Sequence, residues 1–211
     1  MRPIKAFFFD IGNVLLKFSL HKLALELIRN TSVSLIAVKK FFLDSGLEDR
    51  YERGLLSSQE FFDEVKKQLK FRGDLEAFSK IWGSHFSENK EVVELMLDLK
   101  KRSKIYLLSN TNDLHYRFLI RNYDFLSRVD GAALSFEVGH RKPEREMYRS
   151  ALNLAGVKAA ESVFVDDLPE NVEGARKLGI YAIRFTGLEP LKAELDNLND
   201  GLTSTGARGY T

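Results

Sequence analysis

The sequence predicts an α/β fold in which a parallel sheet is covered by helices on both faces and an all-helical segment is inserted after the first strand. From residue 90 onward short apolar runs alternate with amphipathic stretches, which is typical of parallel strands joined by helices. Residues 18–86, in contrast, carry only helical periodicity. Because this stretch separates the first apolar run from the others, we interpret it as an insertion.

The first strand is expected at residues 4–9, where Lys5 alone interrupts an apolar run. Apolar residues of the insertion recur at the i, i+3, i+4 spacing, which places them on one face of a helix. Three such stripes are present, namely Leu23, Ala24, Leu27 and Ile28; Phe61, Phe62, Val65 and Leu69; and Leu75, Phe78, Ile81 and Trp82. Ser57 or Ser58 is expected to cap the second helix, because a serine hydroxyl accepts a hydrogen bond from the first turn.

The second part of the chain supplies the remaining strands and the helices between them. Strands are expected at 105–108, 131–134, 163–165 and 180–185, and helices at 92–99 and 114–123. Pro143, Pro169 and Pro190 are expected to start helices, because proline in the first turn loses no hydrogen bond. The helix after Pro143 carries apolar residues on one face, namely Met147, Tyr148, Ala151 and Leu152. Residues 199–211 contain few apolar side chains and are expected to be frayed.

These elements divide the chain into a core of residues 1–16 and 90–211 and a helical domain of residues 17–89. The core is predicted to be a Rossmann-like parallel sheet with helices on both faces. The length of 211 residues suits one compact core with a small insertion.

The composition is that of an ordinary globular protein, with 44% hydrophobic and 29% charged residues. The 32 Lys and Arg residues and the 30 Asp and Glu residues leave a net charge of +2. Binding to nucleic acid or to a membrane surface usually requires a strong basic excess, so neither partner is expected. The chain has no cysteine, which excludes disulfides and thiolate metal sites. No signal-peptide core or membrane-spanning run is visible, and a cytoplasmic location is expected.

Polar side chains follow the expected strands at their carboxyl ends, which is where parallel sheets bind ligands. Four strands lead to such groups, namely Asp10; Ser109 and Asn110; Lys142; and Asp166 and Asp167. The residues between these positions offer few groups of comparable chemistry. We therefore expect one site at this edge of the sheet.

The residue types at these strand ends suit phosphoryl transfer, which needs a nucleophile, a divalent cation and fixed positive charge. Asp10 can act as the nucleophile and form a covalent phospho-enzyme. Together with Asp166, Asp167 and a backbone carbonyl near Gly12, it also offers the hard oxygen ligands that Mg²⁺ prefers. Gly12 in addition leaves room for the backbone to approach the phosphate.

Three further residues can bind the phosphate itself. Lys142 can neutralise its charge, and Ser109 and Asn110 can donate hydrogen bonds to the transferring oxygens. Each residue taken alone also has a structural interpretation, because Asp10 or Asn110 can cap a helix and Lys142 can be a surface lysine. Two adjacent carboxylates after a buried strand are harder to explain structurally, since buried like charges need a cation. The scattered histidines predict no metal site.

The strand-end residues lie in four motifs that resemble those of the haloacid dehalogenase superfamily. In chain order the motifs are FFFDIGNVLL, LLSNTN, the lysine of HRKPE, and VFVDDLPENV. The stretches YERGLLSSQEF, LSNTNDLH and RKPEREMY resemble more narrowly the bacterial subfamily that includes alpha-D-glucose-1-phosphate phosphatase. The insertion looks like the helical cap domain of that superfamily, which closes over the site and selects the substrate.

This resemblance implies a Mg²⁺-dependent phosphatase that hydrolyses a small phosphate monoester, such as glucose 1-phosphate or another sugar phosphate, through an aspartyl-phosphate on Asp10. It implies three kinds of site residue, which are the metal ligands Asp10, Asp166, Asp167 and the Gly12 carbonyl; the phosphate-binding residues Ser109, Asn110, Lys142, Gly12 and Asn13; and the supporting Asn171. Asp167 is expected to be the main ligand of the acidic pair.

The chain departs from the usual family motif at one position. That motif has a second aspartate two residues after the nucleophile, which protonates the leaving group, and this position is Gly12 here. General acid–base catalysis typically contributes about 10²–10⁴-fold in rate. Either the substrate has a good leaving group, or another group such as His115 or a cap residue donates the proton, or the activity is weak. The narrower subfamily shares the D-x-G-N-V form, which favours an active enzyme.

Two other functions are compatible with a glycine at this position. Haloacid dehalogenases also lack the second aspartate and need no metal, but they lack the acidic pair that is present here as Asp166 and Asp167. An unneeded pair of buried carboxylates is costly, which favours phosphate chemistry. The second alternative is a catalytically weak phosphate-binding module, which an assay with p-nitrophenyl phosphate would distinguish from an enzyme.

Overall fold

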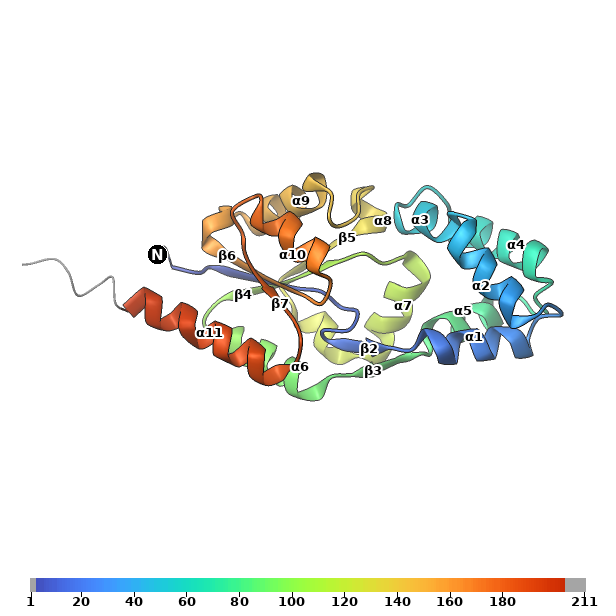
Figure 1. The fold of residues 1–211 in the computed structure, drawn as a ribbon, viewed down its shortest axis with the longest axis horizontal. Coiled ribbons are helices and arrows are strands. Elements are labelled where there is room, and N and C mark those ends of the chain that lie inside the picture. The colour runs from blue at the N-terminus through green and yellow to red at the C-terminus, as the bar shows by residue number, and fades with distance from the viewer. Residues whose placement is uncertain (1–2, 204–211) are drawn as a thin grey trace, which may run out of the picture.

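The computed structural model describes residues 3–203 and has at its centre a five-stranded parallel sheet (Figure 1). In spatial order its strands are β5 (Gly131–Leu134), β4 (Lys104–Ser109), β1 (Ala6–Phe9), β6 (Ser162–Asp166) and β7 (Tyr181–Arg184). All neighbouring strands of this sheet are parallel. The predicted α/β fold with a parallel sheet is therefore confirmed.

Helices cover both faces of the sheet. Successive residues of a buried strand point to opposite sides, so each strand contributes apolar side chains to both faces. Phe7 and Phe9 of β1 belong to one apolar cluster, whereas Phe8 belongs to a second cluster on the other face. The first cluster includes residues of α6 (Lys90–Leu99), α7 (Asp113–Asn122) and α11 (Leu188–Thr203), and the second includes residues of α9 (Arg145–Ala155) and α10 (Pro169–Arg176). Figure 1 shows α9 and α10 on one side of the sheet and α6 and α11 on the other.

Most predicted boundaries of the sheet strands and core helices lie within two residues of the observed ones, and two differences matter for the argument. Pro143 was expected to start a helix, but α9 begins two residues later at Arg145, and Pro143 lies in the turn that carries the polar residues before it. The second difference is that α11 continues to Thr203, five residues into the segment expected to be frayed. The rest of that segment, residues 204–211, lies outside the described residues. Pro169, in contrast, is the first residue of α10 as predicted.

The insertion contains five helices among the described residues, and they have an apolar cluster of their own. They are α1 (Leu20–Arg29), α2 (Leu35–Asp44), α3 (Leu47–Glu52), α4 (Ser58–Leu69) and α5 (Leu75–Gly83). The predicted stripes form the centre of this cluster, in which Phe61, Phe78 and Trp82 are almost fully buried. Ser57 caps α4 by accepting from the Glu60 N–H, and the Glu60 carboxylate accepts from the Ser57 N–H.

Two short strands that the sequence did not predict connect the insertion to the sheet. β2 (Leu16–Phe18) and β3 (Phe86–Glu88) pair antiparallel, with Leu16 opposite Glu88. Figure 1 shows this ribbon running from the sheet toward α1 and α5. The ribbon lies at both boundaries of the proposed helical domain, 17 and 89, although the division into two domains stays a prediction. Within residues 3–203 no helix is both long and apolar enough to cross a bilayer.

Candidate active site

The predicted polar residues come together at the carboxyl ends of three adjacent strands. Asp10 follows the central strand β1, Ser109 is the last residue of β4, and Asp166 is the last residue of β6. Because β1 pairs with both β4 and β6, these strand ends are neighbours. Lys142 reaches the same place from the segment after β5 and the short helix α8 (Ser135–Val138).

Lys142 lies between two buried carboxylates. Its Nζ is 2.9 Å from Asp10 Oδ1 and 2.6 Å from Asp166 Oδ2, and the side chains of Lys142 and Asp166 are 1% and 0% exposed. Burial raises the pKa of Asp10, an effect that the charge of Lys142 opposes and the charge of Asp166 adds to. Burial would lower the pKa of Lys142, but the two carboxylates raise it above its ordinary value. The lysine is therefore charged when all three groups are packed together.

Asp166 and Asp167 differ in how many of their oxygens are free. Asn171 donates to both oxygens of Asp166, at 3.0 and 3.1 Å, and the Leu168 N–H donates to Oδ1 at 2.9 Å. Asp167 is half-buried and accepts one side-chain hydrogen bond, from Asn13 Nδ2 at 3.2 Å. Burial and the charge of Asp166 raise the pKa of Asp167. Of the pair, Asp167 is thus the carboxylate with an oxygen left to bind a further group.

The three carboxylates form a cluster with the ligand chemistry of a divalent cation. Asp10, Asp166 and Asp167 each offer an oxygen, and these oxygens lie within 4.8 Å of one another. Among the described residues this is the one such group of acidic or histidine side chains. Lys142 supplies one positive charge against the negative charges of three carboxylates. The cluster therefore has a net negative charge that favours the binding of a cation.

Asn110 holds the backbone of Lys142 at two points. Its Oδ1 accepts from the Lys142 N–H at 2.7 Å, and its Nδ2 donates to the Lys142 carbonyl at 3.0 Å. Asn110 was predicted to donate to the phosphate, and that contact stays a prediction. The structure adds that its side-chain amide connects the end of β4 to Lys142. The Ser109 hydroxyl donates a long bond of 3.5 Å to the Asn110 carbonyl, and its hydrogen bond to Asp10 lowers the pKa of that carboxyl.

The turn after Asp10 explains the roles of Asn13 and Gly12. Asn13 has a left-handed backbone, with φ 55°, and its Oδ1 accepts from the Phe18 N–H while its amide contacts Asp167. Gly12 has no such φ, and a Cβ added there would meet nothing within 4 Å. The backbone therefore does not require a glycine at this position, and the space beside it is open.

His115, one suggested replacement for the missing general acid, has a structural role. Its ring stacks on Trp82 with centroids 5.0 Å apart, and Nε2 lies 3.0 Å from the Trp82 carbonyl. Nδ1 lies 3.2 Å from Asn112 Nδ2, so both ring nitrogens have partners. Burial lowers the pKa of His115 to about 4. The ring is therefore neutral near pH 7, and its contacts favour a packing role over that of a proton donor.

A second group of charges, between the insertion and the core, was not predicted. Arg53, interpreted from the sequence as part of a charged helix end, makes a two-point ion pair with Glu144 at 2.6 and 3.0 Å. Arg141, next to Lys142, pairs with Asp49 at 2.6 Å and with Glu52 at 2.9 Å. The opposite charges of YERG and HRKPE are visible in the sequence, but their contact is not.

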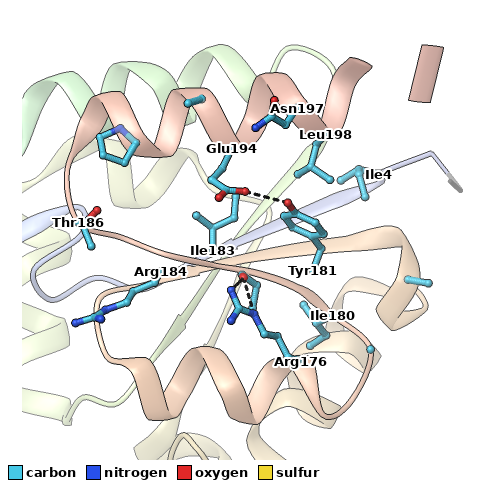
Figure 2. A pocket seen from close by; sticks show the side chains of 15 residues that line it. Ile4, Arg176, Ile180, Tyr181, Ile183, Arg184, Thr186, Glu194, Asn197 and Leu198 are labelled. Atoms are coloured by element: carbon cyan, nitrogen blue, oxygen red, sulfur yellow. Dashed lines mark hydrogen bonds between the residues drawn. The ribbon is translucent and has the colours of Figure 1, made fainter. Parts of the chain in front are cut away.

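The largest described pocket does not contain the predicted site residues. It has a volume of about 730 Å³ and lies between the edge strand β7 and α11 (Figure 2). Tyr181 donates to Glu194 across it, and the guanidinium of Arg176 donates to the Ala182 carbonyl. Another pocket, of about 450 Å³, lies within the insertion and is mostly apolar, with Glu48 among its lining residues.

Comparison with known proteins gives concordant results. Residues 4–179 match the family described as haloacid dehalogenase-like hydrolase. A D-ribitol-5-phosphate phosphatase of Bacteroides thetaiotaomicron is 28% identical over 190 residues, which cover 83% of this chain and 89% of the relative. A sesquiterpene phosphatase of Aspergillus oryzae is 27% identical, with 86% and 90% covered.

Solved structures show the same fold. A wild-type family enzyme of Bacteroides thetaiotaomicron, in complex with magnesium and inorganic phosphate, has a TM-score of 0.76 and 26% identity, with 86% of this chain and 93% of that chain covered. An L-2-haloacid dehalogenase of Xanthobacter autotrophicus has a TM-score of 0.64 and 20% identity, with 92% and 83% covered. The second likeness concerns the fold alone.

Proposed function

Because this chain belongs to the haloacid dehalogenase-like hydrolase family, we propose that it is a magnesium-dependent phosphatase that hydrolyses a small phosphate monoester with Asp10 as its nucleophile. Two curated relatives are phosphatases of a polyol phosphate and of a sesquiterpene, and one similar structure holds magnesium and phosphate. A sugar phosphate such as glucose 1-phosphate is the substrate class that the sequence resemblance suggests.

The observation that carries this proposal is the position of Lys142 between Asp10 and Asp166, with Asp167 in the same cluster. Three carboxylates around one lysine suit Mg²⁺, which prefers hard oxygen ligands. We propose that Asp10, Asp167, Asp166 and the Gly12 carbonyl hold the ion. When bound, it supplies positive charge that offsets the developing charge on the phosphoryl oxygens.

The reaction proceeds in two steps on the side chains of the chain. Asp10 attacks the phosphorus and displaces the alcohol. The product of this step is an aspartyl-phosphate on Asp10. Lys142 and the Ser109 hydroxyl bind the phosphoryl oxygens, and Asn110 keeps Lys142 in place through its backbone. A water molecule then attacks the aspartyl-phosphate, releases inorganic phosphate and restores Asp10. Asn171 supports the site by holding Asp166.

Dehalogenation is the weaker alternative because of the acidic pair. A dehalogenase needs a carboxylate nucleophile but no cation, and three clustered carboxylates that share one lysine would then be incompletely compensated, which is costly. Asp166 is fully buried and Asp167 lies beside it. The same acidic pair argues against the alternative of a catalytically weak phosphate-binding module.

The test is the hydrolysis of p-nitrophenyl phosphate by the purified protein, with Mg²⁺ and with EDTA. We expect turnover with Mg²⁺ only, and Asp10→Asn should lower it by at least about 10³-fold, since the nucleophile is lost. Asp98→Asn, which removes an exposed carboxylate of α6, is the matched control and should be as active as the wild type. Near-wild-type activity of Asp10→Asn would refute the assignment of the nucleophile.

The substrate is to be found by a screen of phosphorylated metabolites that includes sugar 1-phosphates, polyol phosphates and terpenoid phosphates. The polyol and terpenoid members correspond to the two phosphatase relatives. Absence of activity toward all of them and toward p-nitrophenyl phosphate would favour a phosphate-binding module.

A further inference from the structure

The proposed reaction lacks a proton donor for the leaving alcohol. Gly12 stands where the usual motif has the acid, and the two ring nitrogens of His115 are occupied. Lys142 is held by two carboxylates and serves the phosphate. A side-chain donor, if the reaction uses one, would therefore come from another element that reaches the same edge of the sheet.

The segment from α3 to the start of α4 contacts the core at two places, one at the start of α7 and one around Lys142. On one side, the Tyr51 hydroxyl accepts from the Leu114 N–H at 3.1 Å, and Ser58 donates to Asp113 at 2.8 Å. These contacts lie at the start of α7, which follows Ser109 and Asn110 in the chain. The first contact is thus close in sequence to Ser109 and Asn110, which are proposed to bind phosphate at the end of β4.

On the other side, the same segment contacts the residues around Lys142. Arg53 pairs with Glu144, and Asp49 pairs with Arg141. Gly54, whose φ is +68°, packs so closely on the carbonyl of Phe136 in α8 that a Cβ would overlap with it. The segment around the C-terminal end of α3 therefore contacts both the start of α7, a few residues after Ser109, and the residues on either side of Lys142.

Glu52 is the carboxyl group at that end of α3. It is 9% exposed, and its Oε2 lies 2.9 Å from Nη2 of Arg141, the residue before Lys142. Within residues 3–203 this buried Oε2 takes part in no hydrogen bond of good geometry. A buried carboxyl oxygen without such a bond is costly, so it favours either a proton or a substrate partner.

We infer that Glu52 is the general acid of this enzyme, which protonates the leaving alcohol in place of the aspartate that Gly12 replaces. The inference rests on the proposed function and adds a residue to it. The open space beside Gly12 leaves room for the alcohol. The family motifs did not indicate this role, because Glu52 lies in the insertion and not in the core.

The charges that surround Glu52 suit a group that gains and loses a proton near neutrality. Burial raises the pKa of Glu52 to about 7 with a contribution from the charges of Glu48 and Asp49, although the charges of Arg141 and Lys142 oppose the rise. A general acid works best when its pKa lies near the operating pH.

The proton balance closes over the two steps. In the first step Asp10 forms a bond to phosphorus, the bond from phosphorus to the ester oxygen breaks, and that oxygen takes the proton of Glu52 to leave as an alcohol. In the second step the carboxylate of Glu52 takes a proton from the attacking water, and the bond from phosphorus to Asp10 breaks. Each turnover thus restores both side chains.

The test compares n-propyl phosphate, whose alkoxide is a poor leaving group, with p-nitrophenyl phosphate, whose phenolate leaves without a proton. We expect Glu52→Gln to lower kcat/KM for the propyl ester by about 10²-fold or more and to change kcat/KM for the nitrophenyl ester by less than about 3-fold. Asp49→Asn is the matched control, because it removes a neighbouring ion pair to Arg141 from the same helix. It should change both substrates by the same factor.

A glutamate that only stabilises the contact would give a different result. Glu52→Gln would then lower both substrates equally, as Asp49→Asn does, or would leave both unchanged, and either outcome overturns the inference. Wild-type protein that turns over neither substrate with Mg²⁺ would instead refute the proposed function.

Two further measurements test the same role, the first on the wild type and the second on a double variant. For the wild type, kcat/KM for the propyl ester should fall as the pH rises above about 7, and the nitrophenyl ester should show no such fall. In addition, Gly12→Asp should restore activity toward the propyl ester in the Glu52→Gln background. Parallel pH profiles for the two esters, or no restoration by Gly12→Asp in a folded double variant, would count against Glu52.

Discussion

The molecule contains two groups of opposite charges that differ in how they are held. In the core group, Lys142, Asp166 and Asp10 have side chains that are 1%, 0% and 11% exposed, and all three follow strands of one sheet. In the group between the insertion and the core, Arg53 and Glu144 are 25% and 35% exposed and lie on elements that are far apart in the chain. The core group is thus fixed by the sheet, whereas the second depends on how the insertion sits on the core.

This difference has an energetic consequence. Removing one partner of a buried pair leaves an uncompensated charge in a medium that solvates it poorly. Removing one partner of a half-exposed pair leaves a charge that water can solvate. The core group is therefore suited to hold catalytic residues in one geometry. The second group is suited to form and break if the insertion opens and closes over the site, as the family resemblance predicts.

The largest effect on stability is expected from Lys142→Met. The change leaves Asp10 and Asp166 without their counter-charge, and loss of one partner from such a buried pair typically costs about 3–5 kcal/mol. Urea unfolding in EDTA measures the change in the free energy of unfolding. Lys101→Met, which removes an exposed partner of Asp98, is the control and should cost less than about 0.5 kcal/mol. Equal costs for the two variants would contradict the distinction between the groups.

A smaller effect is expected from the addition of Mg²⁺ to the wild type. An ion that binds only the folded protein stabilises it by about 2.7 kcal/mol at a concentration 100 times its Kd. For a chain of this length, this corresponds to a rise of roughly 5–10 °C in Tm. Asp167→Asn should abolish most of the rise, because it removes the carboxylate with a free oxygen, and Asp98→Asn should keep it. A full rise in Asp167→Asn would place the ion elsewhere.

The smallest effect is expected for the Arg53–Glu144 pair, whose coupling energy in a double-mutant cycle of Arg53→Met and Glu144→Gln should be about 0.5–1 kcal/mol at pH 7. Hydrogen bonds from Arg53 lower the pKa of Glu144 from 4.5 to about 2. Because the pKa is lower in the folded protein, the coupling should be complete above about pH 4.5 and should decrease as the pH falls toward 2. A coupling that does not weaken between pH 5 and pH 3 would contradict this assignment.

The elements of the core were predictable because their signals are local. The apolar run before Asp10 and the one before Asp166 each read as a buried strand, and each became one. A serine cap of α4 was equally visible, although Ser57 and Ser58 were both candidates and the structure has Ser57. The short strands β2 and β3 were missed, because strands of three residues that are mostly exposed at least in part carry no clear period. The short helix α8 and the separate helices α2 and α3 were not predicted either. Pro143 was misassigned, since the signal for a helix start did not show that the turn before α9 is used to present Lys142.

The sequence by itself determined the parallel sheet, the insertion and the set of polar residues at the strand ends. These features follow from apolar periodicity and from the alternation of strands and helices along the chain, which depend on neighbours in the sequence. Only the tertiary structure decided which of those residues touch, such as the clamp of Asn110 on Lys142, and only it brought Glu52 to Arg141. The physical reason is that a charge contact between segments about 90 residues apart depends on how two packed units meet. No local pattern encodes that arrangement.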